Sequence, residues 1–180
     1  MITPQFVEGL VESLLKKSFD NPADVPDFHR EMWEMCCSSY KFVAIAAPRG
    51  FAKSTAVTHA YTLACILSRE RSFALIVADT ESQASLFLDD IKKELQTNDD
   101  LIKMFGIKCI VKDSVTDIIV EFDDGHQARL IAKGSGQSLR GIKWNNLRPD
   151  LIICDDLENE ELVLNKERRT KFRRLFSGTL

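Results

Sequence analysis

The chain has 180 residues, of which 44% are hydrophobic and 28% are charged, and its formal net charge is −3. This composition is typical of a globular domain that can fill a core, and the slightly negative charge excludes a uniformly basic coat, though not a local basic face. No apolar run approaches the roughly 18–20 residues that span a bilayer, and the N-terminus lacks a signal-peptide layout. We therefore expect an intracellular protein with no membrane partner.

The five cysteines show neither CxxC pairs nor metal-ligand spacing. An odd, scattered count of this kind is typical of reduced thiols in the cytosol, so we expect thiols that are mostly buried.

The first 40 residues predict two helices. Thr3-Pro4 is typical of a helix start, and apolar residues repeat at helical spacing from Phe6 to Leu15. Asp20-Asn21-Pro22 ends this helix, and a second helix is expected from Phe28 to about Ser38.

Apolar strands alternate with helices from residue 41 onward. Strands are expected at 42–46, 73–78, 107–112, 116–122, 127–132 and 151–154, and helices at about 53–68, at 80–96 and from 160. Asp123-Asp124-Gly125 predicts a hairpin turn, and 133–149 is a loop rich in Gly, Ser and Asn. The pattern predicts an α/β fold with a mostly parallel central sheet, helices on both faces and the hairpin as an insertion. We divide the chain into N-terminal helices at 1–40 and a core at 41–180.

Residues 47–54 read A-P-R-G-F-A-K-S, between an expected strand and an expected helix. Backbone N–H groups at a helix N-terminus, followed by Lys and Ser, bind nucleotide phosphates in the pattern G-x-x-x-x-G-K-[ST]. Both pattern glycines are alanine here, and the methyl group of Ala52 lies where the backbone must approach the phosphates. We predict ATP binding, with Lys53 on the outer phosphates, Ser54 as a ligand of Mg²⁺ and Arg49 able to reach the terminal phosphate. The alternatives are a plain strand-to-helix turn and a surface arginine.

Two carboxylates follow the last strand. Asp155 is expected to hold Mg²⁺ through water, and Asp156 to activate the attacking water, with Glu158 in reserve. The alternative is an aspartate that caps a helix after a strand.

This ordered set of motifs resembles the ATPase domain of phage terminase large subunits, the motors that pump DNA into procapsids. The resemblance covers about residues 25–160 and rests on P-R-G-F-A-K-S-T at 48–55, F-H-R-E-M-W at 28–33, Q-S-L-R-G at 137–141 and the segment 148–159. It implies a P-loop NTPase of the RecA-like additional-strand type, with the segment at 28–33 framing the adenine. Arg49 would act in cis, and Arg140 would reach the nucleotide of a neighbouring subunit, unless it is a loop arginine paired with a nearby acid.

The resemblance also implies the cofactors and partners. The nucleotide would be ATP with Mg²⁺, and the partners would be double-stranded DNA, a portal protein, a small terminase subunit and further copies of the chain in a ring. The location would be the cytoplasm of an infected bacterium, transiently at the procapsid vertex. The expected catalytic residues are Asp156, Arg49, Arg140 and Lys53, the metal ligands are Ser54 and Asp155, and the nucleotide contacts are Pro48, Arg49, Gly50, Phe51, Ala52, Lys53, Ser54, Thr55, Phe28 and Arg30.

The sequence departs from the family at Ala52, where glycine is usual, and at Asp156, where many members carry Glu. The sequence contains no acidic cluster like that of the terminase nuclease domain. We expect the chain to end before the coupling motif; in the alternative interpretation, Ser177-Gly178-Thr179 is that motif. The basic stretch at 166–174 is either a DNA contact or a solvated helix face. Two other functions stay open: a RecA-like helicase or repair ATPase, and a nucleotide-binding assembly module with little turnover.

Overall fold

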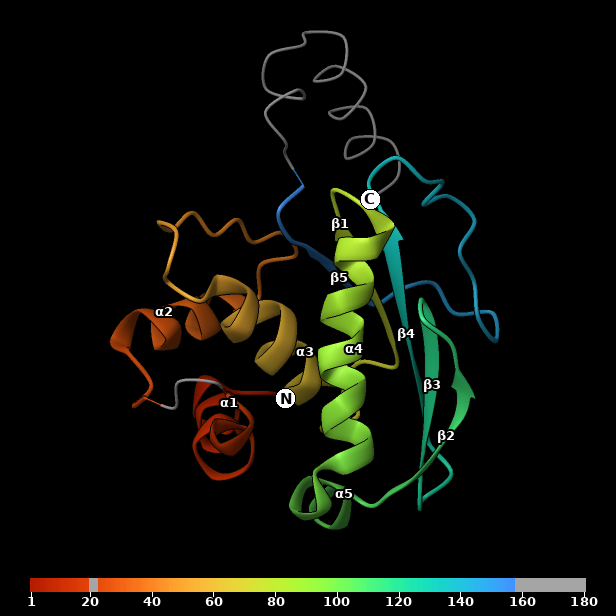
Figure 1. Cartoon of the computed structure of the whole chain (residues 1–180), viewed down its shortest axis with the longest axis horizontal. Helices are drawn as coiled ribbons and strands as arrows, with labels where there is room; N and C mark the ends of the chain where they lie inside the picture. Colours follow the sequence, from red (N-terminus) through yellow and green to blue (C-terminus); the bar gives the residue numbers. More distant parts are fainter. Residues whose placement is uncertain (20–22, 158–180) are drawn as a thin grey trace, which may run out of the picture.

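A five-stranded sheet organises the structure, a computed structural model that describes residues 1–19 and 23–157. The strands are β1 (Phe73–Ala78), β2 (Ile107–Asp113), β3 (Asp117–Phe122), β4 (Gln127–Gly134) and β5 (Leu151–Cys154), in the order β2-β3-β4-β1-β5 (Figure 1). The central strand β1 pairs in parallel with β4 and β5, and all six of its residues are buried. The β2–β3 and β3–β4 pairs are antiparallel. The α/β fold and its hairpin are thus confirmed, but the described sheet is mixed, whereas we predicted a mostly parallel one.

The helices follow the predicted order. They are α1 (Pro4–Leu10), η1 (Val11–Leu15), η2 (Lys16–Ser18), α2 (Asp27–Cys36), η3 (Ser54–Tyr61), α3 (Thr62–Leu67), α4 (Glu81–Thr97) and α5 (Asp99–Phe105). The Thr3 hydroxyl accepts a hydrogen bond from the Phe6 amide, which confirms the predicted start of α1. Helix α5 was not predicted. Asn98 caps its first turn and Gly106, at φ +63°, ends it.

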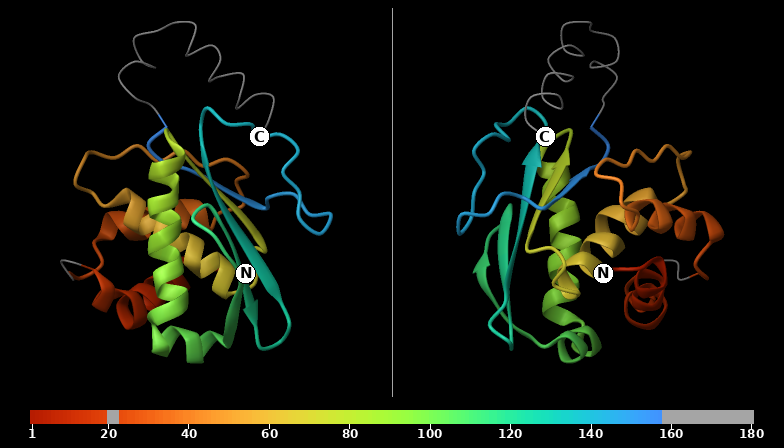
Figure 2. Two further views of the ribbon diagram at one scale, coloured as in Figure 1. Left: turned by 45° about the vertical axis from the view of Figure 1, so that its right-hand side comes forward. Right: turned by 180° about the vertical axis from the view of Figure 1, so that it is seen from behind.

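The helices cover one face of the sheet, as the two views of Figure 2 show. The other face carries a smaller apolar cluster made of Phe73, Leu75, Val77, Ile131 and Leu139, against which Ile142 and Trp144 pack. Both of these residues belong to the loop that connects β4 to β5. The expectation of helices on both faces is therefore wrong for the described residues, because this loop covers the second face.

The segment 42–46 was predicted to be a buried strand, and this prediction is also wrong. The segment forms no strand, and Phe42 is 81% exposed. Strand β5 is hydrogen-bonded to β1 alone among the described strands, so its outer edge offers unpaired backbone groups. An apolar sequence forms a strand only where a neighbouring strand accepts its hydrogen bonds, and 42–46 has no such neighbour in the described part of the chain.

Candidate nucleotide site

Helix α2 is fastened to the loop at 47–54. The Trp33 indole, 1% exposed, donates a hydrogen bond to the Ala56 carbonyl at 2.8 Å. His29 Nε2 lies 3.0 Å from the Phe51 carbonyl oxygen, and the rings of Phe28 and Phe51 have centroids 4.7 Å apart. The segment 28–33 therefore lies directly against the loop at 47–54.

Arg30 points elsewhere. Its guanidinium contacts the Glu8 carboxylate at 2.7 Å and the Asp27 carboxylate at 2.6 Å. These two acids raise the pKa of Arg30, the Glu8 hydrogen bond being the largest cause. Arg30 thus joins α1 to α2, and it does not line the cavity described below.

The loop backbone turns twice through the left-handed region. Gly50 has φ +84° and Ala52 has φ +45°. The first value suits glycine, whereas an L-residue at the second carries strain of about 1–2 kcal/mol. Between these turns and the helix, Lys53 Nζ donates to the carbonyls of Ala47 at 2.8 Å and Pro48 at 3.1 Å, so the lysine closes the loop on itself.

The end of β5 is joined to the helix that follows this loop. The Thr58 hydroxyl donates to Asp155 Oδ2 at 2.6 Å, and the Asp155 amide donates to the Val77 carbonyl at 2.9 Å. Thr58 is 1% exposed and lies one helical turn after Ser54. The predicted metal ligand Asp155 is thereby held against the helix that starts at Lys53.

Asp156 adopts a different conformation. Its φ is +50°, its side chain is exposed, and its Oδ2 accepts a hydrogen bond from Gln83 Nε2 at 3.3 Å. Gln83 lies in the first turn of α4, whose cap is Thr80. The adjacent aspartates therefore face different partners, Asp155 the loop helix and Asp156 the start of α4.

The two predicted arginines are exposed. Arg49 makes no hydrogen bond or ion pair with any residue in the described ranges. Arg140 follows the buried Leu139 and precedes Gly141 at φ +77°. Glu158, the basic stretch at 166–174 and the segment 177–179 lie outside the described residues.

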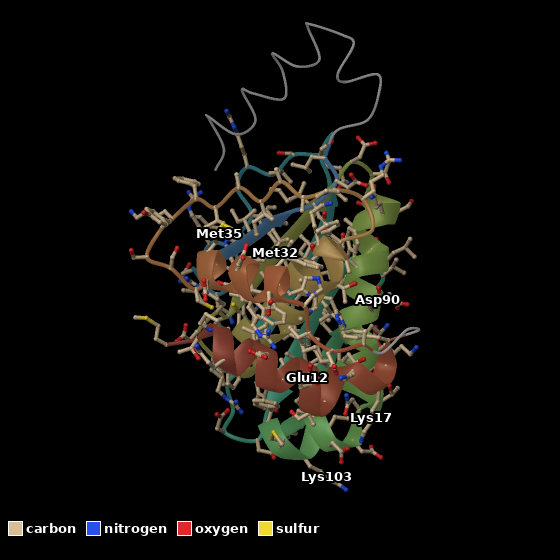
Figure 3. All side chains as sticks on the ribbon, turned by 90° about the vertical axis from the view of Figure 1, so that its left-hand side faces the viewer. Glu12, Lys17, Met32, Met35, Asp90 and Lys103 are labelled. Carbon is tan, nitrogen blue, oxygen red and sulfur yellow. The ribbon has the colours of Figure 1, made fainter. Side chains whose placement is uncertain are left out.

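A cavity of about 760 Å³ lies beside the loop. Its lining includes Phe28 and His29 of α2, Gly50 to Ala52 of the loop, and the η3 residues Ser54, Thr55, Ala56, His59 and Ala60. Phe87, Asp90, Lys93 and Glu94 of α4 form a further wall, and Asp90 is labelled in the side view of Figure 3. Lys53, Asp155 and Asp156 do not line this cavity, so it adjoins the loop at 47–54 on the side of α2.

His59 of η3 is one of the residues that line this cavity. Burial lowers the pKa of its imidazole, and the charges of Glu94 and Asp90 offset part of that effect. The sequence assigned no role to Thr58, Gln83 or His59. Only Thr58 carried a usable signal, because it lies one turn beyond Ser54 on the predicted helix.

The cysteines and acids are possible metal ligands. Among the described residues, no group of three His, Cys, Asp or Glu side chains could hold a metal ion. Of the five free thiols, Cys65 is buried and Cys109 and Cys154 are exposed, so the expectation of mostly buried thiols is wrong. Burial raises the pKa of Cys65 to about 12, which keeps that thiol unreactive.

Comparison with protein-family models finds no match for this chain, and comparison with curated proteins finds no significant match. Among the described helices, none has the length and apolar character needed to cross a membrane.

Proposed function

We propose that this chain binds MgATP at the loop 47–54 and hydrolyses it, as the ATPase motor domain of a DNA-packaging terminase. The observation that carries the proposal is the hydrogen bond from Thr58 to Asp155. It brings the carboxylate that ends a parallel strand against the helix that follows the Lys-Ser pair, and a magnesium nucleotide site needs these two elements together.

The residues present fit a magnesium ion bound together with phosphates. Mg²⁺ is usually bound by one or two protein oxygens, several waters and the phosphates of its nucleotide, so a preformed cluster of acids is not required. Ser54 and Asp155 would supply these oxygens. When bound, the magnesium nucleotide supplies the phosphoanhydride bond to be broken.

The roles of the chain's own groups follow from their positions. Lys53 would exchange its bonds to the carbonyls of Ala47 and Pro48 for bonds to phosphate oxygens. Asp156, exposed and held by Gln83, would orient and deprotonate the attacking water. Arg49, unpaired within the described ranges, would neutralise charge on the terminal phosphate.

The cavity beside the loop would receive the base and sugar. Its volume of about 760 Å³ lies within the usual range for ligand pockets, and the Phe28 and Phe51 rings supply apolar surface next to the phosphate loop. Pro48, Gly50, Ala52 and Thr55 would complete the nucleotide contacts through the loop and the first helical turn.

We further infer that the sheet is that of a P-loop NTPase of the additional-strand type. The outer edge of β5 has no partner among the described strands, and the apolar segment 42–46 is likewise unpaired. One further strand between them would satisfy the backbone groups of both. The double-stranded DNA substrate, the portal protein, the small terminase subunit, the ring of copies and the role of Arg140 in a neighbouring site are proposed on the resemblance alone.

Steady-state ATPase measurements on the wild type, Lys53→Ala and Asp156→Asn test the proposal, with Lys103→Ala as a matched control on the exposed surface of α5. We expect both site variants to lose most turnover and the control to keep it. A wild-type rate no higher than that of the site variants would overturn the hydrolase function. If the wild type showed no such activity but still bound a fluorescent ATP analogue that Lys53→Ala did not bind, the chain would be a nucleotide-binding assembly module.

Arg140 has a separate test. Mixing Arg140→Ala subunits with Lys53→Ala subunits should restore part of the activity if Arg140 acts in trans. Absence of complementation in an active ring would contradict that role.

A further inference from the structure

The segment 125–149 contains no acidic residue. It holds five cationic residues, in a chain whose net charge is −3: Arg129, Lys133, Arg140, Lys143 and Arg148. Most of the segment is the loop that covers the second face of the sheet, on which no described helix packs, opposite α1 and α2 (Figures 1 and 2). This segment therefore carries a net positive charge within a chain that is otherwise acidic.

An ordered hairpin presents part of this charge. Trp144 and Leu147 exchange backbone hydrogen bonds at 3.0 and 2.7 Å, and the two residues between them, Asn145 and Asn146, have φ of +48° and +65°. Positive φ at both central residues is a feature of tight type I′ turns. The Trp144 ring packs edge-on against Phe73, with centroids 6.0 Å apart, so the sheet holds the hairpin in place.

Lys143 immediately precedes Trp144 and Arg148 immediately follows Leu147, so the two cations flank this turn. Both are exposed, and neither forms a salt bridge with any residue in the described ranges. Like charges that flank one bridge repel each other, and an anion bound between them would remove that cost. Arg129, by contrast, is already neutralised by Asp117 at 2.6 Å.

Lys133 extends the charge along the sheet. It follows Ile131 by two residues on β4, so both side chains are on the face of the Phe73 cluster. Lys133 forms no ion pair with a described residue. The cationic positions thus run from the carboxyl end of β4 to the hairpin at 143–148.

The surface fits a phosphate backbone better than unstacked bases. Proteins that bind single strands stack successive bases on exposed aromatic rings, but Trp144, the one aromatic residue of Phe, Tyr or Trp type in 125–149, is occupied by Phe73. Lys and Arg side chains beside Asn side chains are the groups that contact phosphate oxygens of a duplex.

We propose that the hairpin at 143–148, together with Lys133, binds the phosphate backbone of duplex DNA on the loop-covered face of the sheet. The choice of a duplex rests in part on the proposed motor function, whereas the charged surface does not depend on nucleotide chemistry. Binding therefore needs no ATP.

Fluorescence anisotropy of a labelled DNA duplex without nucleotide, at increasing salt concentrations, tests the proposal on the whole chain. The test variant is Lys143→Gln with Arg148→Gln. The control is Lys17→Gln with Lys103→Gln, which removes the same charge from the helical side, where Figure 3 labels both lysines. We expect the test variant to bind roughly tenfold more weakly, with a salt slope smaller by about 2, and the control to bind as the wild type does.

Lys53→Ala should retain duplex binding. An absence of ATPase activity would therefore not contradict the DNA-binding inference, and an absence of duplex binding would be detected independently of ATPase activity. A wild type that does not bind the duplex, or a test variant that binds like the control, would overturn it. Tighter binding of a single strand than of the duplex would also overturn it. A further contradicting result would be self-association of the chain that the test variant abolishes while its DNA binding is unchanged. The cationic surface would then contact a second copy of the chain.

Discussion

Thr58 donates a 2.6 Å hydrogen bond to Asp155, and this contact joins two segments that lie 97 residues apart in the sequence. The hydroxyl is fully buried and the carboxylate is partly buried, so the bond is shielded from competing water. A hydrogen bond to a charged group contributes about 1.5–3 kcal/mol. Thr58 therefore positions the Asp155 carboxylate relative to the loop at 47–54, although it is not expected to touch the nucleotide.

Thr58→Val should weaken magnesium-dependent nucleotide binding by roughly tenfold, because an isosteric side chain leaves Asp155 without its donor. Titration of a fluorescent ATP analogue with and without Mg²⁺ measures the effect. Thr58→Ser should keep the hydroxyl and retain most of the affinity. Thr62→Val, a buried threonine one turn later at the start of α3, is the matched control, and an equal loss in both valine variants would contradict a positioning role.

The backbone of the loop gives a second, paired prediction. Gly50 is at φ +84° with open space around its Cα, so Gly50→Ala should lower nucleotide affinity and cost about 1–2 kcal/mol through backbone strain alone. Ala52→Gly should relieve the strain at φ +45° and raise both loop order and affinity. Urea unfolding and nucleotide titration together check the two variants. If Ala52→Gly weakened binding, the alanine methyl would be a favourable contact and the strain argument would fail.

Much of this fold could be predicted because its signals are local. The buried β1, the Asp123-Asp124-Gly125 turn and the Thr3 cap each depend on residues close in sequence. The failures concern pairing over long distances. The segment 42–46 has strand composition, but its structure depends on whether a neighbouring strand is present. The cover of the second sheet face by Leu139, Ile142 and Trp144 could not be predicted either, because their apolar side chains lie in a loop rich in Gly, Ser and Asn.

The sequence indicated the residues of the candidate site, but it did not indicate their contacts. Lys53 and Asp155 were both expected, and the structure brings their elements together through Thr58, which the motif does not contain. Arg30 was expected near the nucleotide, and its position instead depends on Glu8 of α1, a tertiary contact invisible to a motif. Motifs therefore indicated candidate residues, whereas packing decided which of them meet.

Asp117, which forms ion pairs with Arg129 and Lys112, should make the free energy of unfolding depend on pH in acid. Burial raises the pKa of Asp117, but the hydrogen bonds and charges of Arg129 and Lys112 outweigh it, so the folded pKa is depressed. The unfolded chain then binds more protons near pH 4, and the stabilisation present above that pH is lost as the pH falls through the folded pKa.

Asp117→Asn should therefore lower the free energy of unfolding at neutral pH by about 1–3 kcal/mol and flatten its decline below about pH 4. Urea denaturation across the acid range measures both. Asp89→Asn, at an exposed position on α4, is the control and should leave the acid profile unchanged. An unaltered profile in Asp117→Asn would contradict the assignment.

His59 should make the protein less stable in mild acid. Burial lowers the pKa of its imidazole in the folded state, while the unfolded value stays near 6.5. The unfolded chain consequently binds more protons below that pH, so stability is fully present above about pH 6.5 and falls as the pH decreases toward the folded pKa. The decline can reach about 1.4 kcal/mol per pH unit from this one group. His59→Gln should abolish most of the slope that begins below about pH 6.5, whereas His126→Gln should retain it because His59 is unchanged. Urea unfolding at closely spaced pH values provides the measurement, and an equal slope in wild type and His59→Gln would mean that the imidazole can be protonated inside the cavity wall without cost.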